Sequence, residues 1–204
     1  MTATPTATAH SSSQCSGGYY GEHCYMPLFI FEGLSGKLVA AILRPGRTNK
    51  RDNVAGLLIR LITYLRKFRK NTVITVRGDG MFSSNEFMEW ARQQPRLHFV
   101  LGFSGNSRLS QRVAAWVDRA EEQHRRTGED VKVYYRFMYR ATLWEQAQWI
   151  VVKIEFNSLG KNVRYVVTDM YDKPPKVVYE DWDCKRGNCE LDIQEMKDGL
   201  RADR

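Results

Sequence analysis

The stretch "VITVRGDGMF", residues 73–82, places Asp79 between two glycines directly after a β-branched, apolar run. In α/β sheets, functional side chains collect beyond the carboxyl ends of the strands. The flanking glycines also permit the close approach of a ligand or another chain. Asp79 is therefore a candidate site residue. The alternative is an ordinary turn, because Asp-Gly after a strand is a common turn signal.

A second candidate group lies in "CKRGNCELDIQEMKDGL", where the pattern predicts a helix. Arg186, Glu190 and Lys197 are four and seven residues apart and share one helix face, so one carboxylate stands between two cations. The apolar stripe beside them consists of Cys189, Ile193 and Met196. The alternative is a solvated ion-pair face, in which each pair contributes only about 0.2–0.5 kcal/mol.

Periodicity and turn signals predict the elements that carry these residues. The first part reads β-β-α-β-α-β: a hairpin from "CYMPLFIFE" and "GKLVAAILRPG", then "NVAGLLIRLITYLRKF", "NTVITVR", "SSNEFMEWARQ" with Ser83 or Ser84 as N-cap, and "LHFVLGF". A helix around Leu109 to Ala120 follows, and then come the strand patterns "VKVYYRFMYR", "QWIVVKIEF" and "VRYVVTDMY". The order predicts an α/β fold, with these last three strands in a separate antiparallel unit.

The same pattern predicts the domain organisation. Residues 1–18 contain almost no bulky apolar residue, so we expect a disordered tail. Residues 19–105 and 173–204 form the expected α/β core, and residues 106–172 form a β-rich insertion.

The net charge of +8 favours a polyanionic partner, nucleic acid or an anionic membrane surface. No apolar run approaches the roughly 20 residues of a membrane span, and the N-terminus has no signal-peptide pattern, so we expect a cytoplasmic protein without a membrane partner. Cations dominate residues 44–77, which suits either a DNA-tracking surface or a solvated helix face. Aromatic residues between 134 and 149 suit either stacking on unpaired bases or sheet packing.

These motifs together resemble the DDE transposases of bacterial insertion sequences. The matching features are the strand end "VRGDG", the later Arg-x3-Glu-x6-Lys helix and the β-rich insertion between them. "GYYGEHCYMPLFIFEG", "LVAAILRPG" and "LHFVLGFSGNSRL" also resemble segments of that family. The resemblance extends from about Gly18 to Arg204, and the order and spacing of the motifs make the combination specific.

The resemblance implies a ribonuclease H-like mixed sheet with flanking helices and a two-metal mechanism of DNA strand cleavage and transfer. Asp79 and Glu190 would be catalytic carboxylates that hold Mg²⁺ or Mn²⁺, ions that prefer oxygen ligands. Arg77, Arg186 and Lys197 would bind DNA. The implied partners are double-stranded DNA at transposon ends and either a second copy of the chain or an intact transposase, in association with the nucleoid.

The sequence also departs from the family pattern. The family's first catalytic aspartate stands on the first strand, some two dozen residues before "CYMPL", but no acidic residue precedes Glu22. We therefore expect the first metal ligand and the first central strand to be missing and the chain to be truncated at both ends. The family's tyrosine three positions before the arginine is Asp183 here.

Three functional hypotheses follow. The first is a transposase fragment that is inactive alone, because a site without one of three carboxylates loses most of its affinity for divalent ions. The second is a non-catalytic, basic DNA-binding module or a regulator of an intact transposase. The third is a relic whose product folds poorly and lacks cooperative unfolding.

Overall fold

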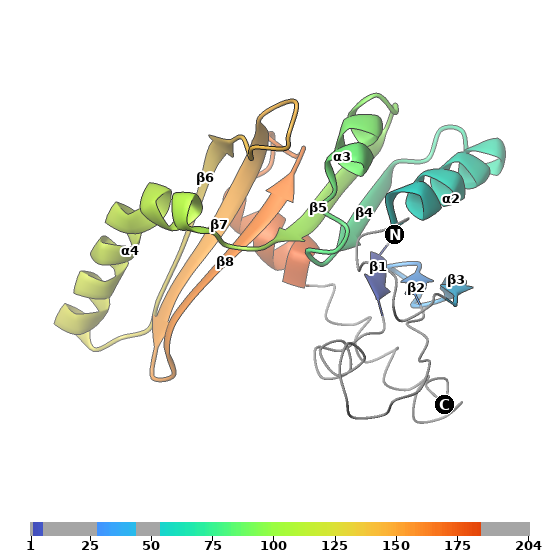
Figure 1. Ribbon diagram of the computed structural model, residues 1–204. Helices are drawn as coiled ribbons and strands as arrows, with labels where there is room; N and C mark the ends of the chain where they lie inside the picture. Colours follow the sequence, from blue (N-terminus) through green and yellow to red (C-terminus); the bar gives the residue numbers. More distant parts are fainter. Residues whose placement is uncertain (1, 6–27, 44–53, 185–204) are drawn as a thin grey trace, which may run out of the picture.

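The computed structural model describes residues 2–5, 28–43 and 54–184, which form a mixed α/β fold (Figure 1). The strands are β1 (Thr2–Pro5), β2 (Leu28–Phe31), β3 (Leu38–Ile42), β4 (Ile74–Gly78), β5 (Leu97–Phe103), β6 (Val131–Tyr139), β7 (Gln148–Asn157) and β8 (Gly160–Thr168). The helices are α2 (Val54–Phe68), α3 (Asn85–Arg92), α4 (Ser107–Thr127), the short α5 (Pro175–Val177) and the π-helix η1 (Val178–Asp183).

All eight strands belong to one sheet in the order β3-β2-β1-β4-β5-β8-β7-β6. β4 runs parallel to both β1 and β5, and the other neighbouring pairs are antiparallel. The carboxyl ends of β4 and β5 therefore lie at the same edge of the sheet. Mixed pairing of this kind is compatible with the ribonuclease H-like fold that the resemblance implies.

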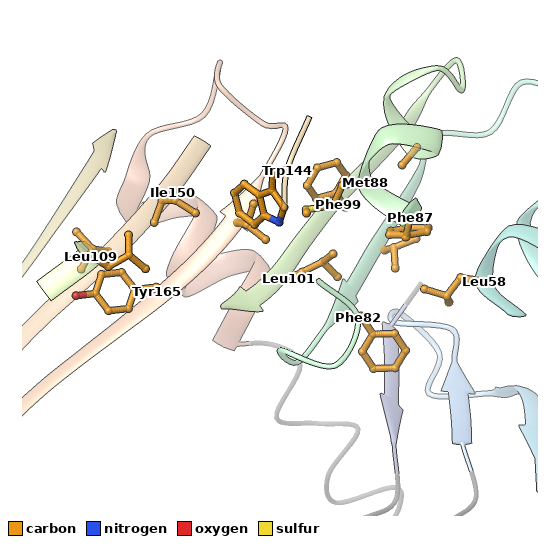
Figure 2. Close-up of a cluster of buried hydrophobic side chains, with 14 of the residues drawn as sticks. Leu58, Phe82, Phe87, Met88, Phe99, Leu101, Leu109, Trp144, Ile150 and Tyr165 are labelled. Atoms are coloured by element: carbon orange, nitrogen blue, oxygen red, sulfur yellow. The ribbon is translucent and has the colours of Figure 1, made fainter. Parts of the chain in front are cut away.

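Strand alternation divides the buried side chains between the two faces of the sheet. On one face, the larger core joins alternate strand residues to apolar residues of α2, α3 and α4. Figure 2 shows part of this core, in which Phe82 from the loop after β4 lies with Phe87 and Leu58. On the other face, a smaller core packs Val100, Val151 and Val166 against η1. η1 therefore packs against β5, β7 and β8.

Local sequence signals explain the helix boundaries near that edge. Ser84 is the N-cap of α3, and its hydroxyl accepts a hydrogen bond from the amide N–H of Phe87 at 3.2 Å. Asn106 caps α4 in the same way by accepting from Leu109 N–H at 2.9 Å. Gly128 ends α4 with φ 71°, a left-handed conformation that glycine adopts without strain. The predicted cap at Ser84 is confirmed.

The element order predicted from the sequence is confirmed from β2 to β8. The structure differs at Thr2–Pro5, which were expected in a tail, with the first central strand missing. These residues form β1, which pairs antiparallel with β2 and parallel with β4. Composition did not predict this strand because Thr, Ala and Pro give no bulky apolar pattern, and its pairing with β2 and β4 cannot be seen in the sequence. Residues 6–18 of the expected tail lie outside the described residues.

The strands β6, β7 and β8 form the expected antiparallel set, but they are not a separate sheet. β8 also pairs antiparallel with β5, from Val100 with Thr168 to Phe103 with Tyr165. The aromatic side chains of this set pack internally: Tyr135 stacks on Trp116 of α4 with ring centroids 4.4 Å apart. In residues 2–5, 28–43 and 54–184, no helix combines the length and apolar character that crossing a membrane requires.

Candidate active site at the end of strand β4

Asp79 follows the last residue of β4, a strand whose five residues are all buried. A tight turn holds it in place. Its carboxylate oxygen Oδ1 accepts a hydrogen bond from Met81 N–H at 2.8 Å, and its carbonyl accepts one from Phe82 N–H at 3.1 Å. The Ser83 hydroxyl donates to the Gly80 carbonyl at 2.9 Å. The turn predicted from "RGDG" is confirmed, and the candidate site residue Asp79 lies within it.

Two glycines allow the turn to pack closely. A Cβ atom at Gly78 would lie 2.5 Å from Cδ2 of Phe82, whose ring folds back over the strand end. A Cβ at Gly102 of β5 would lie 3.3 Å from the Cα of Asp79. The Asp79 backbone therefore rests directly on β5, a close approach that a larger residue at position 102 would disturb.

Asp79 opens onto a pocket of about 480 Å³, a volume in the usual range for ligand sites. Four segments build it: the Asp79 turn, the end of β5 with the loop after it, β8, and the end of η1. The described lining residues are Asp79, Gly80, Gly102, Phe103, Ser104, Gly105, Val163, Arg164, Tyr165, Tyr179, Asp183 and Cys184. The carboxyl end of β4 therefore faces a hollow that contains a second carboxylate, Asp183, and a cation, Arg164.

Arg77, expected to bind DNA, points inward from β4. Its side chain is 7% exposed, and its Nη1 donates to the carbonyl oxygen of Trp182 in η1 at 3.3 Å. This contact joins the strand that carries Asp79 to the helix that carries Asp183. A contact between Arg77 and DNA would require η1 to move away.

Burial governs the protonation of the groups around η1. It raises the pKa of Tyr179, and the negative charge of Asp183 adds to this effect. Burial likewise raises the pKa of the Cys184 thiol, again with a contribution from Asp183. Both groups therefore stay protonated near neutral pH, and the negative charge on this side of the pocket belongs to carboxylates.

A charged cluster on β6, β7 and β8 lies against the ring of Tyr179. Lys153 is nearly buried, and its Nζ lies 2.6 Å from Glu155 Oε2 and 5.6 Å from the Tyr179 ring centroid. Lys132 Nζ lies 3.3 Å from Glu155 Oε1, and Asn162 Nδ2 donates to Glu155 Oε2 at 3.3 Å. Glu155 thus joins three partners beneath η1. The hydrogen bond from Lys153 is the main reason why the pKa of Glu155 is lowered.

The variant Glu155→Gln should lower the free energy of unfolding by about 1–3 kcal/mol at pH 7, because it removes a charged partner from a buried ammonium group. The lowered pKa sets the sign of the pH dependence: the stabilisation is present above the ordinary value of 4.5 and is lost as the pH falls through the folded-state pKa. Urea unfolding at pH 7 and pH 3 measures both effects. Glu121→Gln, on the exposed surface of α4, is the control. An equal loss of stability at both pH values would contradict the account.

The donor types partly fit a divalent metal ion. Asp79 and Asp183 offer carboxylate oxygens, which hard cations prefer. Within the described ranges, however, no three acidic, histidine or cysteine side chains gather as a metal site. Arg186, Glu190 and Lys197 lie outside the described residues, so their predicted helix is not placed. The described chain ends at Cys184, which lines the pocket two positions before Arg186.

Sequence reasoning did not place Asp183, Arg164 or Gly102 at the site. Asp183 was noted only as a departure from a family tyrosine. Arg164 gave no local signal, because the pairing of β8 with β5 brings it to this edge from a strand assigned to the insertion. The close approach of Gly102 to Asp79 also depends on the pairing between β4 and β5.

Comparison with known proteins gives one informative result. No curated protein matches this chain. The family model described as "Transposase DDE domain group 1" matches residues 4–204, which include β1 from Thr4 onward, Asp79, the described pocket residues and the segment that carries Glu190. The chain therefore belongs to the DDE transposase domain family, group 1.

Proposed function

We propose that this chain carries the domain in which DDE transposases perform their chemistry on DNA and that the pocket at Asp79 is the position of that active site. The observation that carries the proposal is the position of Asp79 at the carboxyl end of β4, open to a pocket that the end of η1 also lines. The chain leads from that helix directly into the Arg-x3-Glu-x6-Lys segment of the family match.

Each residue has a proposed role. Asp79 and Glu190 contribute carboxylate oxygens to a Mg²⁺ or Mn²⁺ site, and Arg186 and Lys197 neutralise phosphates of double-stranded transposon-end DNA. When bound, the metal ions would activate the attacking oxygen and stabilise the leaving oxygen at a phosphodiester bond. The buried Arg77 holds η1 beside Asp79 and acts as a positioning residue.

The 204-residue chain alone should not cut DNA. β1 lies between β2 and β4 in the sheet, but its sequence, "TATP", contains no carboxylate. A two-metal site that lacks the carboxylate of the first central strand should bind divalent ions weakly. DNA binding does not need that third carboxylate, because phosphate contacts depend on cations.

We therefore expect the chain to bind duplex DNA in a strongly salt-dependent way and to leave supercoiled plasmid uncut in Mg²⁺ or Mn²⁺. Fluorescence anisotropy of a labelled duplex measures the binding, and agarose electrophoresis of the plasmid measures nicking. Nicking that depends on Mn²⁺ and disappears in Asp79→Ala would contradict the predicted inactivity while supporting the role of Asp79. DNA binding that does not change with salt concentration would contradict the proposed contacts between basic residues and DNA phosphates.

The absence of a carboxylate in β1 also favours a second function, a non-catalytic DNA-binding module or a regulator of an intact transposase. The two functions differ in one respect. A module needs no metal ion at Asp79, so Asp79→Asn would leave Mn²⁺ binding unchanged. A catalytic domain would lose Mn²⁺ affinity in the same variant.

A further inference from the structure

We propose that Arg164 binds a DNA phosphate inside the Asp79 pocket. The proposal rests on the proposed function and adds to it a binding residue that lies outside the family motifs. Arg164 belongs to β8, on the sheet face that carries η1, and lines the same pocket as Asp79. Among the described lining residues it is the cation, beside the carboxylates Asp79 and Asp183.

A hydrogen bond within the protein orients the side chain of Arg164 and leaves part of its guanidinium group available to a ligand. Its Nε donates to Asn162 Oδ1 at 3.1 Å, and Asn162 Nδ2 in turn donates to Glu155 Oε2 at 3.3 Å. Across residues 2–5, 28–43 and 54–184, Asn162 is the hydrogen-bond partner of this guanidinium, which leaves Nη1 and Nη2 for a ligand. A guanidinium held at Nε presents its terminal nitrogens as a rigid pair that matches two phosphate oxygens.

The charges of the pocket favour a phosphodiester as that ligand. Arg164 lines the same hollow as the two carboxylates, and Gly80, Ser104 and Gly105 are among the other residues that line it. A DNA strand that reaches Asp79 must bring its phosphates past these carboxylates, which repel them. Arg164 offsets this repulsion at the pocket, whereas Arg77 is buried and its Nη1 donates to the carbonyl oxygen of Trp182 in η1.

The test is duplex DNA binding by the 204-residue chain over a range of salt concentrations. We expect Arg164→Ala to weaken binding about 10-fold and to reduce the slope of log K against log salt by about one, the loss of one phosphate contact. Arg164→Gln should behave in the same way, and Arg164→Lys should keep the slope but bind more weakly than wild type. Arg119→Ala, on the exposed face of α4, is the matched control and should change neither quantity.

A double-mutant cycle locates the contact. Asp79→Asn removes a repelling charge, so it should strengthen DNA binding in the wild-type background and do so less in Arg164→Ala. The same change combined with Arg119→Ala should be additive. Thermal melting checks that each variant folds, and Arg164→Gln replaces the alanine variant in the cycle if the latter melts early.

The outcomes separate the two proposals. Absence of salt-dependent binding by the wild type would contradict the proposed function. Normal wild-type binding with Arg164→Ala indistinguishable from Arg119→Ala, or with additive effects of Asp79→Asn and Arg164→Ala, would overturn the role of Arg164 alone.

Discussion

Gly78→Ala should lower the free energy of unfolding by about 1–3 kcal/mol, the range for inserting a methyl group into a packed core. The new Cβ would lie 2.5 Å from Cδ2 and 2.7 Å from Cγ of Phe82, inside the van der Waals contact distance. Phe82 is 1% exposed and belongs to the core that joins the sheet to α2 and α3, so its ring has little room to move. Urea unfolding measures the change.

The physical cause can be isolated by removing the ring. In a Phe82→Ala background the clash is absent, so Gly78→Ala should cost at least about 1 kcal/mol less than in the wild type. Gly80→Ala is the control in the same turn, because its Cβ would make ordinary contacts of 3.5 Å and 3.6 Å. If Gly78→Ala costs the same with and without the Phe82 ring, close packing is not the reason for glycine at this position.

Asp79→Asn should reduce the affinity of the chain for Mn²⁺ at least about 10-fold. Replacing a residue that only hydrogen-bonds to a metal ligand already lowers metal affinity about 10-fold to 100-fold, and the loss of a ligand itself should lower it at least as much. The amide retains an oxygen that can accept from Met81 N–H, so the turn should keep its shape. Calorimetric titration of Mn²⁺ into both proteins measures the difference.

Asp118→Asn is the matched control for that experiment, since it removes one exposed carboxylate from α4. It should leave the titration unchanged. If both variants reduce Mn²⁺ affinity equally, the ion binds to general surface charge and Asp79 has no special role. If neither variant changes it, the binding-module function becomes the better account.

The sequence predicted those parts of the fold that short-range signals determine. The β-branched run before Asp79 predicted β4, and Ser84 predicted the start of α3 because a serine hydroxyl satisfies an amide of the first turn. The position of Asp79 at a strand end followed directly. β1 was missed because its pairing with β2 and β4 is not visible in its composition.

Pairing between strands that are far apart in the sequence brings the pocket-lining residues together, so local sequence patterns did not predict them. Arg164 reaches the pocket through the pairing of β8 with β5. The resemblance implied that Arg77 binds DNA, yet Arg77 is buried and contacts η1, which lies about a hundred residues later in the chain. The division into a core of residues 19–105 and 173–204 with an insertion at 106–172 remains a proposal, and β5 and β8 join the two parts in one sheet.

Divalent ions should bind at the Asp79 pocket, although weakly in this chain, and site-resolved line broadening by Mn²⁺ in nuclear magnetic resonance spectra tests this expectation most directly. The account predicts that substoichiometric Mn²⁺ broadens the backbone amide signals of Gly80, Ser104 and Gly105 first and that Asp79→Asn abolishes this broadening. Broadening centred elsewhere, for instance around Glu155 or Asp118, or broadening at the pocket that persists in Asp79→Asn, would contradict the account.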